Sequence, residues 1–596
     1  MLKFASATLS IVALLLVYSF YVVDVVSFNS SSNHSSSSLT RKKKLQVVVE
    51  KEVESLLNWK STLNRSHSFL HSWKRSSTAR TTSPCKWYGI TCNSQGSVAE
   101  LKLNGLGLHG TLHSLNFTSF ANVVSLNLGN NTLVGSIPFQ ISYLSKLAYL
   151  DLSYNNFSGY IPPEIGFLTN LNGLYIGHNQ IVGSIPTSLC NLSSLTTLLL
   201  YENQLSGVIP REIGRLNSLI RLEWDSNNLI GAIPNSLCNL TNLEFLYLSK
   251  NQLSGTIPQE IGRLRSLIHL EWFSNNLIGP IPTSLCNLAN LENLYLSDNQ
   301  LSSTIPQEIG RLTSLIDFQL TSNNFTGSIP TSLCNLSNLN FLYLSDNQFS
   351  GTIPREIGRL TSLTELGLAT NNFTGRIPTS LCNLSYLNSL YLFENKFSGT
   401  IPQELGRLTS LEIIILYTNN LVGPIPTSLC NLSNLNILYL NRNQLSGTIP
   451  QDIGRLGSLT ELILTTNNLI GHIPNSLCNL SNLRTLFLIE NKLSGPIPRD
   501  IGRLSSLIDL QLSTNNLTGP IPISLYKLIN LKILRIYENQ LSGTIHEEIG
   551  NMMSLSDLEL AVNYLVGPIP ASICNLSNLT IYIFFKINFL VSSQKK

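Results

Sequence analysis

Residues 150–162 read LDLSYNNFSGYIP and residues 174–186 read LYIGHNQIVGSIP, so one framework of apolar residues, asparagine, glycine and Ile-Pro returns after 24 residues. Its asparagine stands at every 24th position from Asn131 to Asn563 without a slip. A strict period of this length is typical of a solenoid, in which each repeat packs only against its neighbours. The sequence predicts one α/β repeat solenoid over residues 98–582, with one short strand per repeat in a parallel sheet on the concave side.

The leucines of each repeat alternate with other residues, so they point into a narrow core on one side of a strand. The asparagine carries both a donor and an acceptor, and its amide can hydrogen-bond the backbone of the next turn. Trp224 and Trp272 occupy the second leucine position of their strands. We therefore expect both tryptophans to be buried.

Composition argues against several functional classes. The charged fraction is 12%, about half the usual share, and the net charge of +4 comes with no basic patch among aromatics for nucleic acid. The sequence has no glycine-rich phosphate loop with its lysine and no kinase HRD or DFG motif. Repeated acid–arginine pairs such as Glu260 and Arg263 fit a solvated convex surface better than a hydrolase site. We expect no catalytic residue, metal, cofactor or nucleic-acid partner, and so no enzyme.

The N-terminus predicts secretion. In residues 1–28, Lys3 precedes the apolar run 11–17, which is typical of a signal peptide. An uncleaved membrane anchor is the alternative, because the apolar character extends to Val26. Residues 29–45 then read as a serine-rich, basic linker.

Asn-x-Ser/Thr sequons along the chain agree with passage through the secretory pathway. Several of them arise because the repeat itself contains Asn-Leu-Ser. The predicted glycosylation sites are Asn116, Asn156, Asn191, Asn239, Asn324, Asn335, Asn372, Asn383, Asn431, Asn479, Asn516 and Asn575.

Residues 46–97 do not follow the repeat. An apolar pattern with helical spacing runs from Val49 to Trp59, and Cys85 and Cys92 follow it. The first core layer of a solenoid has no neighbour on one side, so a cap must cover it. In an oxidising compartment the two cysteines would staple this cap, whereas two thiols alone cannot complete a zinc shell. We predict a disulfide here and no metal site.

Several segments carry a family resemblance. ESLLNWK at residues 54–60 and PCKWYGITC at residues 84–92 resemble the N-terminal cap of plant leucine-rich-repeat proteins, and LSGVIP at residues 205–210 resembles their plant-specific repeat. Together, over residues 46–582, they resemble the extracellular region of plant leucine-rich-repeat receptor-like kinases and receptor-like proteins. The resemblance implies a leucine-rich-repeat superhelix with a disulfide-stapled helical cap, at the outer face of the plasma membrane or in the apoplast. It also implies a secreted peptide or protein ligand and a co-receptor kinase of the somatic-embryogenesis class. A full-length relative would be a serine/threonine protein kinase.

Two kinds of repeat alternate, so the unit of duplication is 48 residues. One kind carries a cysteine where the other carries a glycine. The cysteines are Cys190, Cys238, Cys286, Cys334, Cys382, Cys430 and Cys478, and the glycines are Gly214, Gly262, Gly310, Gly358, Gly406, Gly454 and Gly502. Rungs stack about 4.8 Å apart, so equivalent cysteines lie ~10 Å apart, too far for a disulfide, which needs Cα atoms within ~7 Å. We expect small buried thiols rather than a redox or metal ladder.

The concave sheet is the surface that can discriminate between ligands, because residues between and after the strand leucines face solvent there. We predict that the ligand binds an aromatic row at the central strand position of the cysteine repeats, beside a mostly acidic row three residues further on. The predicted ligand-binding residues are Tyr247, Tyr295, Tyr343, Tyr391, Tyr439, Phe487, Asp298, Asp346 and Glu394. Tyrosine offers apolar area and a polar tip at low entropic cost. Recent duplication alone is an equally good interpretation of the repeated tyrosines.

The C-terminus leaves two functions open. Position 582 holds tyrosine where the repeat needs leucine, and inserting one residue restores the pattern at Ile583 and Asn588, so residues 583–596 read as a degraded repeat and tail. The sequence contains no C-terminal cap, membrane helix or kinase of this family. One interpretation is the truncated ectodomain of a receptor-like kinase, joined to a membrane only through missing C-terminal parts or an uncleaved N-terminus. The other is a free apoplastic recognition protein that resembles the polygalacturonase-inhibiting proteins.

Overall fold

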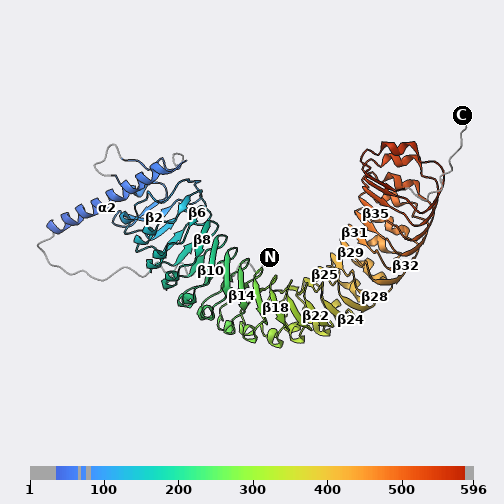
Figure 1. The fold of residues 1–596 in the computed structure, drawn as a ribbon, viewed down its shortest axis with the longest axis horizontal. Helices are drawn as coiled ribbons and strands as arrows, with labels where there is room; N and C mark the ends of the chain where they lie inside the picture. The colour runs from blue at the N-terminus through green and yellow to red at the C-terminus, as the bar shows by residue number, and fades with distance from the viewer. Residues whose placement is uncertain (1–34, 65–68, 76–81, 584–596) are drawn as a thin grey trace.

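The computed structural model describes residues 35–64, 69–75 and 82–583. They form one arc of stacked rungs, with helix α2 (Ser35–Thr62) at its N-terminal end (Figure 1). The predicted signal peptide at residues 1–28 lies outside the described residues. Within the described part of the chain, no helix combines the length and the apolar character needed to cross a membrane.

The inner side of the arc is a 22-stranded sheet. Strand β1 (Ile90–Cys92) pairs antiparallel with the next strand of the sheet. All later neighbours pair in parallel, and except in the first of these parallel pairs the paired residues are 24 positions apart in the sequence. The parallel strands are β2 Val98–Lys102, β3 Ser125–Asn127, β5 Tyr149–Asp151, β7 Gly173–Tyr175, β9 Thr197–Leu199, β11 Arg221–Glu223, β13 Phe245–Tyr247, β15 His269–Glu271, β17 Asn293–Tyr295, β19 Asp317–Gln319, β21 Phe341–Tyr343, β23 Glu365–Gly367, β25 Ser389–Tyr391, β27 Ile413–Ile415, β29 Ile437–Tyr439, β31 Glu461–Ile463, β33 Thr485–Phe487, β35 Asp509–Gln511, β37 Ile533–Arg535, β39 Asp557–Glu559 and β41 Ile581–Ile583. The predicted parallel sheet is confirmed.

The inner sheet takes one strand from each repeat, as predicted, but a second strand that the sequence did not predict follows the asparagine in each rung from Asn131 to Asn563. These strands are β4 Val134–Ser136, β6 Asn156–Gly159, β8 Gln180–Ser184, β10 Gln204–Val208, β12 Asn228–Ala232, β14 Gln252–Thr256, β16 Asn276–Gly279, β18 Gln300–Ser303, β20 Asn324–Gly327, β22 Gln348–Gly351, β24 Asn372–Gly375, β26 Lys396–Gly399, β28 Asn420–Gly423, β30 Gln444–Gly447, β32 Asn468–Gly471, β34 Lys492–Gly495, β36 Asn516–Pro520, β38 Gln540–Gly543 and β40 Tyr564–Leu565. Each pairs in parallel with its neighbours. In Figure 1, β24, β28 and β32 lie farther from the inner edge of the arc than β25 and β29.

The ladder asparagines use both amide atoms. Asn323 accepts a hydrogen bond at Oδ1 from the backbone N–H of Leu301 at 2.9 Å, and its Nδ2 donates to the carbonyls of Leu296 at 2.9 Å and Leu320 at 3.1 Å. Leu296 and Leu301 belong to the preceding rung, whereas the sequence predicted a bond to the next one. The chain turns sharply at Ser322, whose φ is 57°, and so places the amide against the rung before it.

The convex side consists of short 3-10 turns, from η2 (Phe117–Ser119) to η21 (Ala571–Asn575). The two kinds of repeat are packed closely there. A Cβ on Gly406 would lie 2.2 Å from the carbonyl oxygen of Ser428 in the next rung, and the Ser428 hydroxyl donates back to the carbonyl of Gln403 at 2.5 Å. The 48-residue unit is therefore a physical pair of rungs, which needs glycine in the first rung and serine in the second.

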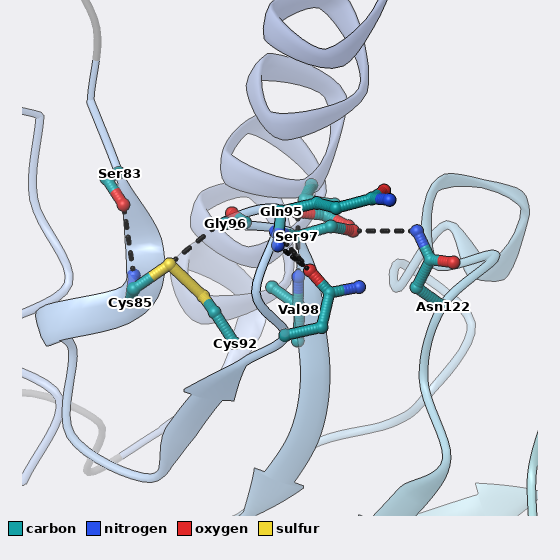
Figure 2. Close-up of a disulfide and its surroundings, with 10 residues drawn as sticks. Ser83, Cys85, Cys92, Gln95, Gly96, Ser97, Val98 and Asn122 are labelled. Carbon is teal, nitrogen blue, oxygen red and sulfur yellow. Dashed lines mark hydrogen bonds between the residues drawn. A yellow bond between two sulfur atoms is a disulfide. The ribbon is translucent and has the colours of Figure 1, made fainter. Parts of the chain in front are cut away.

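The N-terminal cap is fastened by a disulfide and a buried carboxylate. Cys85 and Cys92 form the predicted bond, with their Cα atoms 5.4 Å apart (Figure 2). Glu52 of α2 is fully buried and accepts hydrogen bonds from the Ser97 hydroxyl and from the backbone N–H of Val98. Burial raises the pKa of the Glu52 carboxyl. These bonds hold α2 against β2, where the helix covers the first core layer.

Both ends of the described chain differ from the sequence prediction. Helix α2 begins at Ser35 and so takes in most of the predicted linker at residues 29–45, because residues 41–45 are arginine, lysines and leucine, all good helix formers. At the other end, Leu558 pairs with Tyr582 in the unbroken 24-residue register, so the inserted residue was a wrong prediction. Parallel pairing uses the backbone, and the strand tolerates tyrosine in place of leucine with its side chain exposed. Most of the predicted tail lies outside the described residues.

Candidate functional site

The aromatic row lies on the concave sheet, at the last residue of every second strand. Tyr247 ends β13, Tyr295 ends β17, and the series continues to Phe487 at the end of β33. All six rings are partly exposed. Strand alternation places them on the face opposite the buried leucines, as the sequence predicted. The fold thus aligns the six rings in one row, on alternate strands of the sheet.

Three of the tyrosine hydroxyls are already engaged within the protein. Each donates a hydrogen bond to a carboxylate that lies 22 residues later, on the next strand. The pairs are Tyr295 with Asp317, Tyr343 with Glu365, and Tyr439 with Glu461. Burial and the carboxylate both raise the pKa of these hydroxyls. The ring faces, rather than the polar tips, are therefore what these tyrosines offer to a ligand.

The predicted acidic row stands at the rim of the sheet rather than among the rings. Asp298, Asp346 and Glu394 occupy the turn that ends each strand, with φ of 53°, 55° and 51°, and all three are exposed. Asp346 accepts a hydrogen bond from Ser322 at 2.9 Å and Glu394 accepts one from Thr370 at 3.1 Å. The acids thus line one edge of the row.

A second group of carboxylates, to which the sequence analysis gave no role, lies on the strands or directly after them. We call Glu223, Asp225, Glu271 and Asp317 the acidic segment. Glu223 is 8% exposed and Asp317 is 9% exposed, and Arg221 is paired with Glu223. Burial, followed by the nearby carboxylates, raises the pKa of Asp225 to about 6 and that of Glu271 to about 7. The sequence feature that could have revealed this group was the acidic residue at the central strand position of the glycine repeats.

Further along the chain, a group of apolar side chains lies on the concave face. We call Phe393, Ile413, Ile415, Tyr417, Ile437 and Ile463 the apolar segment. The rings of Phe393 and Tyr417 stack with their centroids 4.6 Å apart, and all six side chains are partly exposed.

The buried residues give the fold its core. Trp224 and Trp272 are fully buried, as predicted, although neither indole N–H has a hydrogen-bond partner within the described residues. The cysteines spaced by 48 residues are free, and burial raises the pKa of Cys286 to about 11. A thiol of this kind stays protonated and inert. The described residues contain no group of three or more His, Cys, Asp or Glu side chains that could hold a metal ion.

The asparagines of the predicted glycosylation sites are exposed. None belongs to the strands of the inner sheet: they lie at the 3-10 turns or at the start of second strands. Asn335, for example, ends turn η11 (Thr331–Asn335), and Asn372 begins β24. Glycans at these positions would leave the concave face open, and their presence stays a prediction.

Three family models match the chain. A leucine rich repeat N-terminal domain matches residues 49–93, a leucine-rich repeat region matches residues 282–400, and single leucine rich repeats match eight segments from residue 146 to residue 552.

Curated relatives from Arabidopsis thaliana are similar over short stretches. The leucine-rich repeat receptor-like serine/threonine-protein kinase RGI4 is 39% identical over 117 residues, which is 20% of this chain and 10% of the relative. The receptor-like kinase RGI3 is 38% identical over 102 residues, 17% of this chain and 9% of the relative. The aligned part thus spans about a tenth of these relatives.

Solved structures are similar over most of the chain. The plant peptide hormone receptor RGFR1 in complex with RGF2 has 38% identity and a TM-score of 0.82, over 85% of this chain and 80% of that one. PEPR1 with AtPEP1 has 34% identity and a TM-score of 0.83, over 91% and 79%. The Arabidopsis receptor kinase HAESA, with the peptide hormone IDA and the co-receptor SERK1, has 34% identity and a TM-score of 0.74, over 90% and 93%.

Proposed function

Because this chain belongs to the family of plant leucine-rich-repeat receptors, we propose that it is an extracellular recognition domain that binds a secreted peptide or protein on its concave face. The observation that carries the proposal is the row of partly exposed rings on alternate strands, in which hydroxyls such as that of Tyr295 are fixed by the protein's own carboxylates. Rings fixed in this way supply apolar contact area at a low entropic cost.

The ligand lies along Tyr295, Tyr343, Tyr391 and Tyr439, with Tyr247 and Phe487 at the ends of the row. The acids Asp298, Asp346 and Glu394 at the rim favour basic residues in the ligand. The likeness to RGFR1 and PEPR1, both solved with bound peptides, supports a peptide rather than a small molecule.

A co-receptor kinase of the somatic-embryogenesis class is the second proposed partner. The support is the likeness to HAESA, whose structure contains the co-receptor SERK1. The disulfide of the cap fits an oxidising compartment, so we place the domain at the outer face of the plasma membrane or in the apoplast.

A binding screen followed by footprinting tests the proposal. The purified chain is screened against a panel of synthetic secreted peptides by calorimetry, and hydroxyl-radical footprinting then maps the tyrosines that any binder protects. We expect protection of Tyr343 and Tyr391, with no change at Phe167, which is 71% exposed on the convex turn η4 (Pro163–Phe167). Protection confined to the convex side would overturn the proposal.

A further inference from the structure

The acidic segment lies on the concave face toward the N-terminal end of the aromatic row. Its strands run from β11 to β19, and Tyr247 of β13 lies opposite Glu223 of β11 and opposite Glu271 of β15. The carboxylates of Glu223 and Glu271 thus flank one ring of the row.

Arg221, a cation of the chain itself, already binds to part of this surface. Arg221 donates from Nε to Glu223, and its guanidinium carbon lies 4.8 Å from the ring centroid of Phe245 and 5.7 Å from that of Tyr247. Aromatic faces beside a carboxylate are a favourable environment for a planar guanidinium. Two rungs further on, Glu271 occupies the position equivalent to Glu223, on the other side of Tyr247.

There, the carboxylates form no ion pair. Among the described residues, Glu271 has no ion pair or side-chain hydrogen bond, and Asp225 accepts a hydrogen bond from the Ser226 hydroxyl at 3.3 Å but forms no ion pair. Phe273 follows two residues after Glu271, and Lys250 Nζ lies 5.9 Å from its ring centroid.

A buried hydroxyl supplies a second, independent observation. Ser249 is 1% exposed, and its Oγ has no hydrogen-bond partner among the described residues. It stands between Asp225 and Phe273 in the row that follows the strands, and alternation directs its side chain to the same face as Tyr247. A buried hydroxyl without a partner is costly, and a donor from a ligand would satisfy it.

The same features at the C-terminal end are already occupied. Ser513 is also fully buried with an unpartnered hydroxyl. On the neighbouring strand, however, Arg535 pairs with Asp557 and Glu559, so the carboxylates of that region already have their cation. Asp225 and Glu271, by contrast, form no ion pair among the described residues.

We propose that Asp225, Ser249 and Glu271 form a subsite for one arginine side chain of the bound peptide. The guanidinium donates to the two carboxylates and to the serine hydroxyl while it lies between the rings of Tyr247 and Phe273. Arginine suits the subsite better than lysine because its planar group stacks on rings and donates in several directions at once. The proposal deepens the proposed function and rests on it for the identity of the occupant.

Electrostatics supports the subsite and gives it a pH dependence. Burial raises the pKa of Glu271 to about 7, and so do Asp225, Glu223 and Asp317, while Arg221 lowers it. A guanidinium needs the ionised carboxylates, so we expect its affinity to rise between pH 5 and pH 8.

The other titratable groups around the subsite do not reverse this trend. Burial lowers the pKa of His269 on β15, so this imidazole is neutral over most of the range. Burial raises the pKa of Tyr247 to about 12 and raises that of Tyr295 as well, so both hydroxyls stay neutral. Lys250 is exposed in the turn that follows β13, and its Nζ lies 5.9 Å from the Phe273 ring centroid.

The test uses N-acetyl-L-arginine N-methylamide as the probe, with saturation-transfer NMR on the whole chain at pH 5 and pH 8. We expect saturable binding at pH 8 that weakens at pH 5 and is absent for the citrulline analogue, which has the same shape without the charge. Glu271→Gln and Asp225→Asn should each weaken it about tenfold. Asp509→Asn, a partly buried carboxylate elsewhere on the concave face, is the matched control and should leave it unchanged.

Equal binding of the citrulline analogue, or equal binding by Glu271→Gln and the wild type, would overturn the subsite, and so would an absence of saturable binding. The probe does not depend on the natural ligand, so this result is separate from the peptide screen. A peptide that protects the aromatic row but is insensitive to Glu271→Gln would overturn the subsite and leave the proposed function standing.

Discussion

The convex and concave faces repeat the same 48-residue alternation for different reasons. On the convex face the alternation is sterically required, because a Cβ on Gly454 would lie 2.1 Å from the carbonyl oxygen of Ser476. On the concave face, Tyr439 is partly exposed and packs against no such constraint. Convex repetition therefore specifies how rungs stack, whereas the concave residues can differ from rung to rung and produce the acidic and apolar segments.

The largest effect on stability is expected at the asparagines that recur every 24 residues, because they join the two faces. Asn371→Ala removes the acceptor of the Phe349 N–H and the donors to the carbonyls of Leu344 and Leu368. Buried backbone groups are left unpaired, so we expect the free energy of unfolding to fall by about 3 kcal/mol. Urea denaturation followed by circular dichroism measures it. If Asn371→Ala lowered the free energy of unfolding by less than the concave variant Asn441→Ala does, the distinction between residues that build the stack and residues that only line its surface would be wrong.

The convex constraint is tested by a matched pair of glycines in one repeat. Gly454→Ala should lower the free energy of unfolding by about 1–3 kcal/mol, because the added methyl group meets the backbone of the next rung. Gly457→Ala is the control, since nothing lies within 4 Å of the Cβ that alanine would add there. The two denaturation midpoints should differ clearly, and equal midpoints would remove the steric explanation of the alternation.

One residue departs from the repeat, and we predict that restoring the repeat there stabilises the protein. Ser303 occupies a position that is glycine in the neighbouring rungs and has a φ of 76°, a left-handed conformation that costs a non-glycine residue roughly 1–2 kcal/mol. Ser303→Gly should therefore raise the free energy of unfolding by about 1 kcal/mol. Ser302→Gly in the same strand serves as the control and should not stabilise the protein.

The smallest effect is expected in the acidic segment. The pKa of Glu271 is raised to about 7 in the folded protein, so its contribution to stability is fully present below about pH 4 and is lost as the pH rises through 7. Glu271→Gln should flatten this decline by less than about 1 kcal/mol, because solvent screens a partly exposed group. Denaturation midpoints at pH 5 and pH 8 give the comparison. A steeper decline in the variant would reverse the sign and contradict the assignment.

Patterns confined to one repeat could be predicted from the sequence. The period indicated the solenoid, the leucine positions placed Trp224 in the core, and the spacing of Cys85 and Cys92 indicated the disulfide. Contacts between repeats were harder to see. The bond from Tyr295 to Asp317 joins positions 22 residues apart, which becomes visible only when the strand pairing is known.

Local backbone geometry explains the other differences. The turn that carries Asp298 to the rim has positive φ in every rung, yet residues as different as Thr370 and Val562 occupy this position. The residue type therefore does not indicate the turn in the sequence. The second strand was missed because Asn-x-Leu-x-Gly contains a single buried apolar residue and is too short to show alternation.

The central claim is that the concave rings bind the ligand, whereas the convex repeats only build the stack. The most direct measurement is the dissociation constant of a peptide from the screen for Tyr295, Tyr343, Tyr391 and Tyr439, each replaced by alanine, beside Arg263→Ala on the convex side. We predict a loss of roughly 1–3 kcal/mol of binding free energy for at least one tyrosine and no change for Arg263→Ala. Unchanged affinity for all four alanine variants would contradict the account and leave the aromatic row as a product of duplication alone.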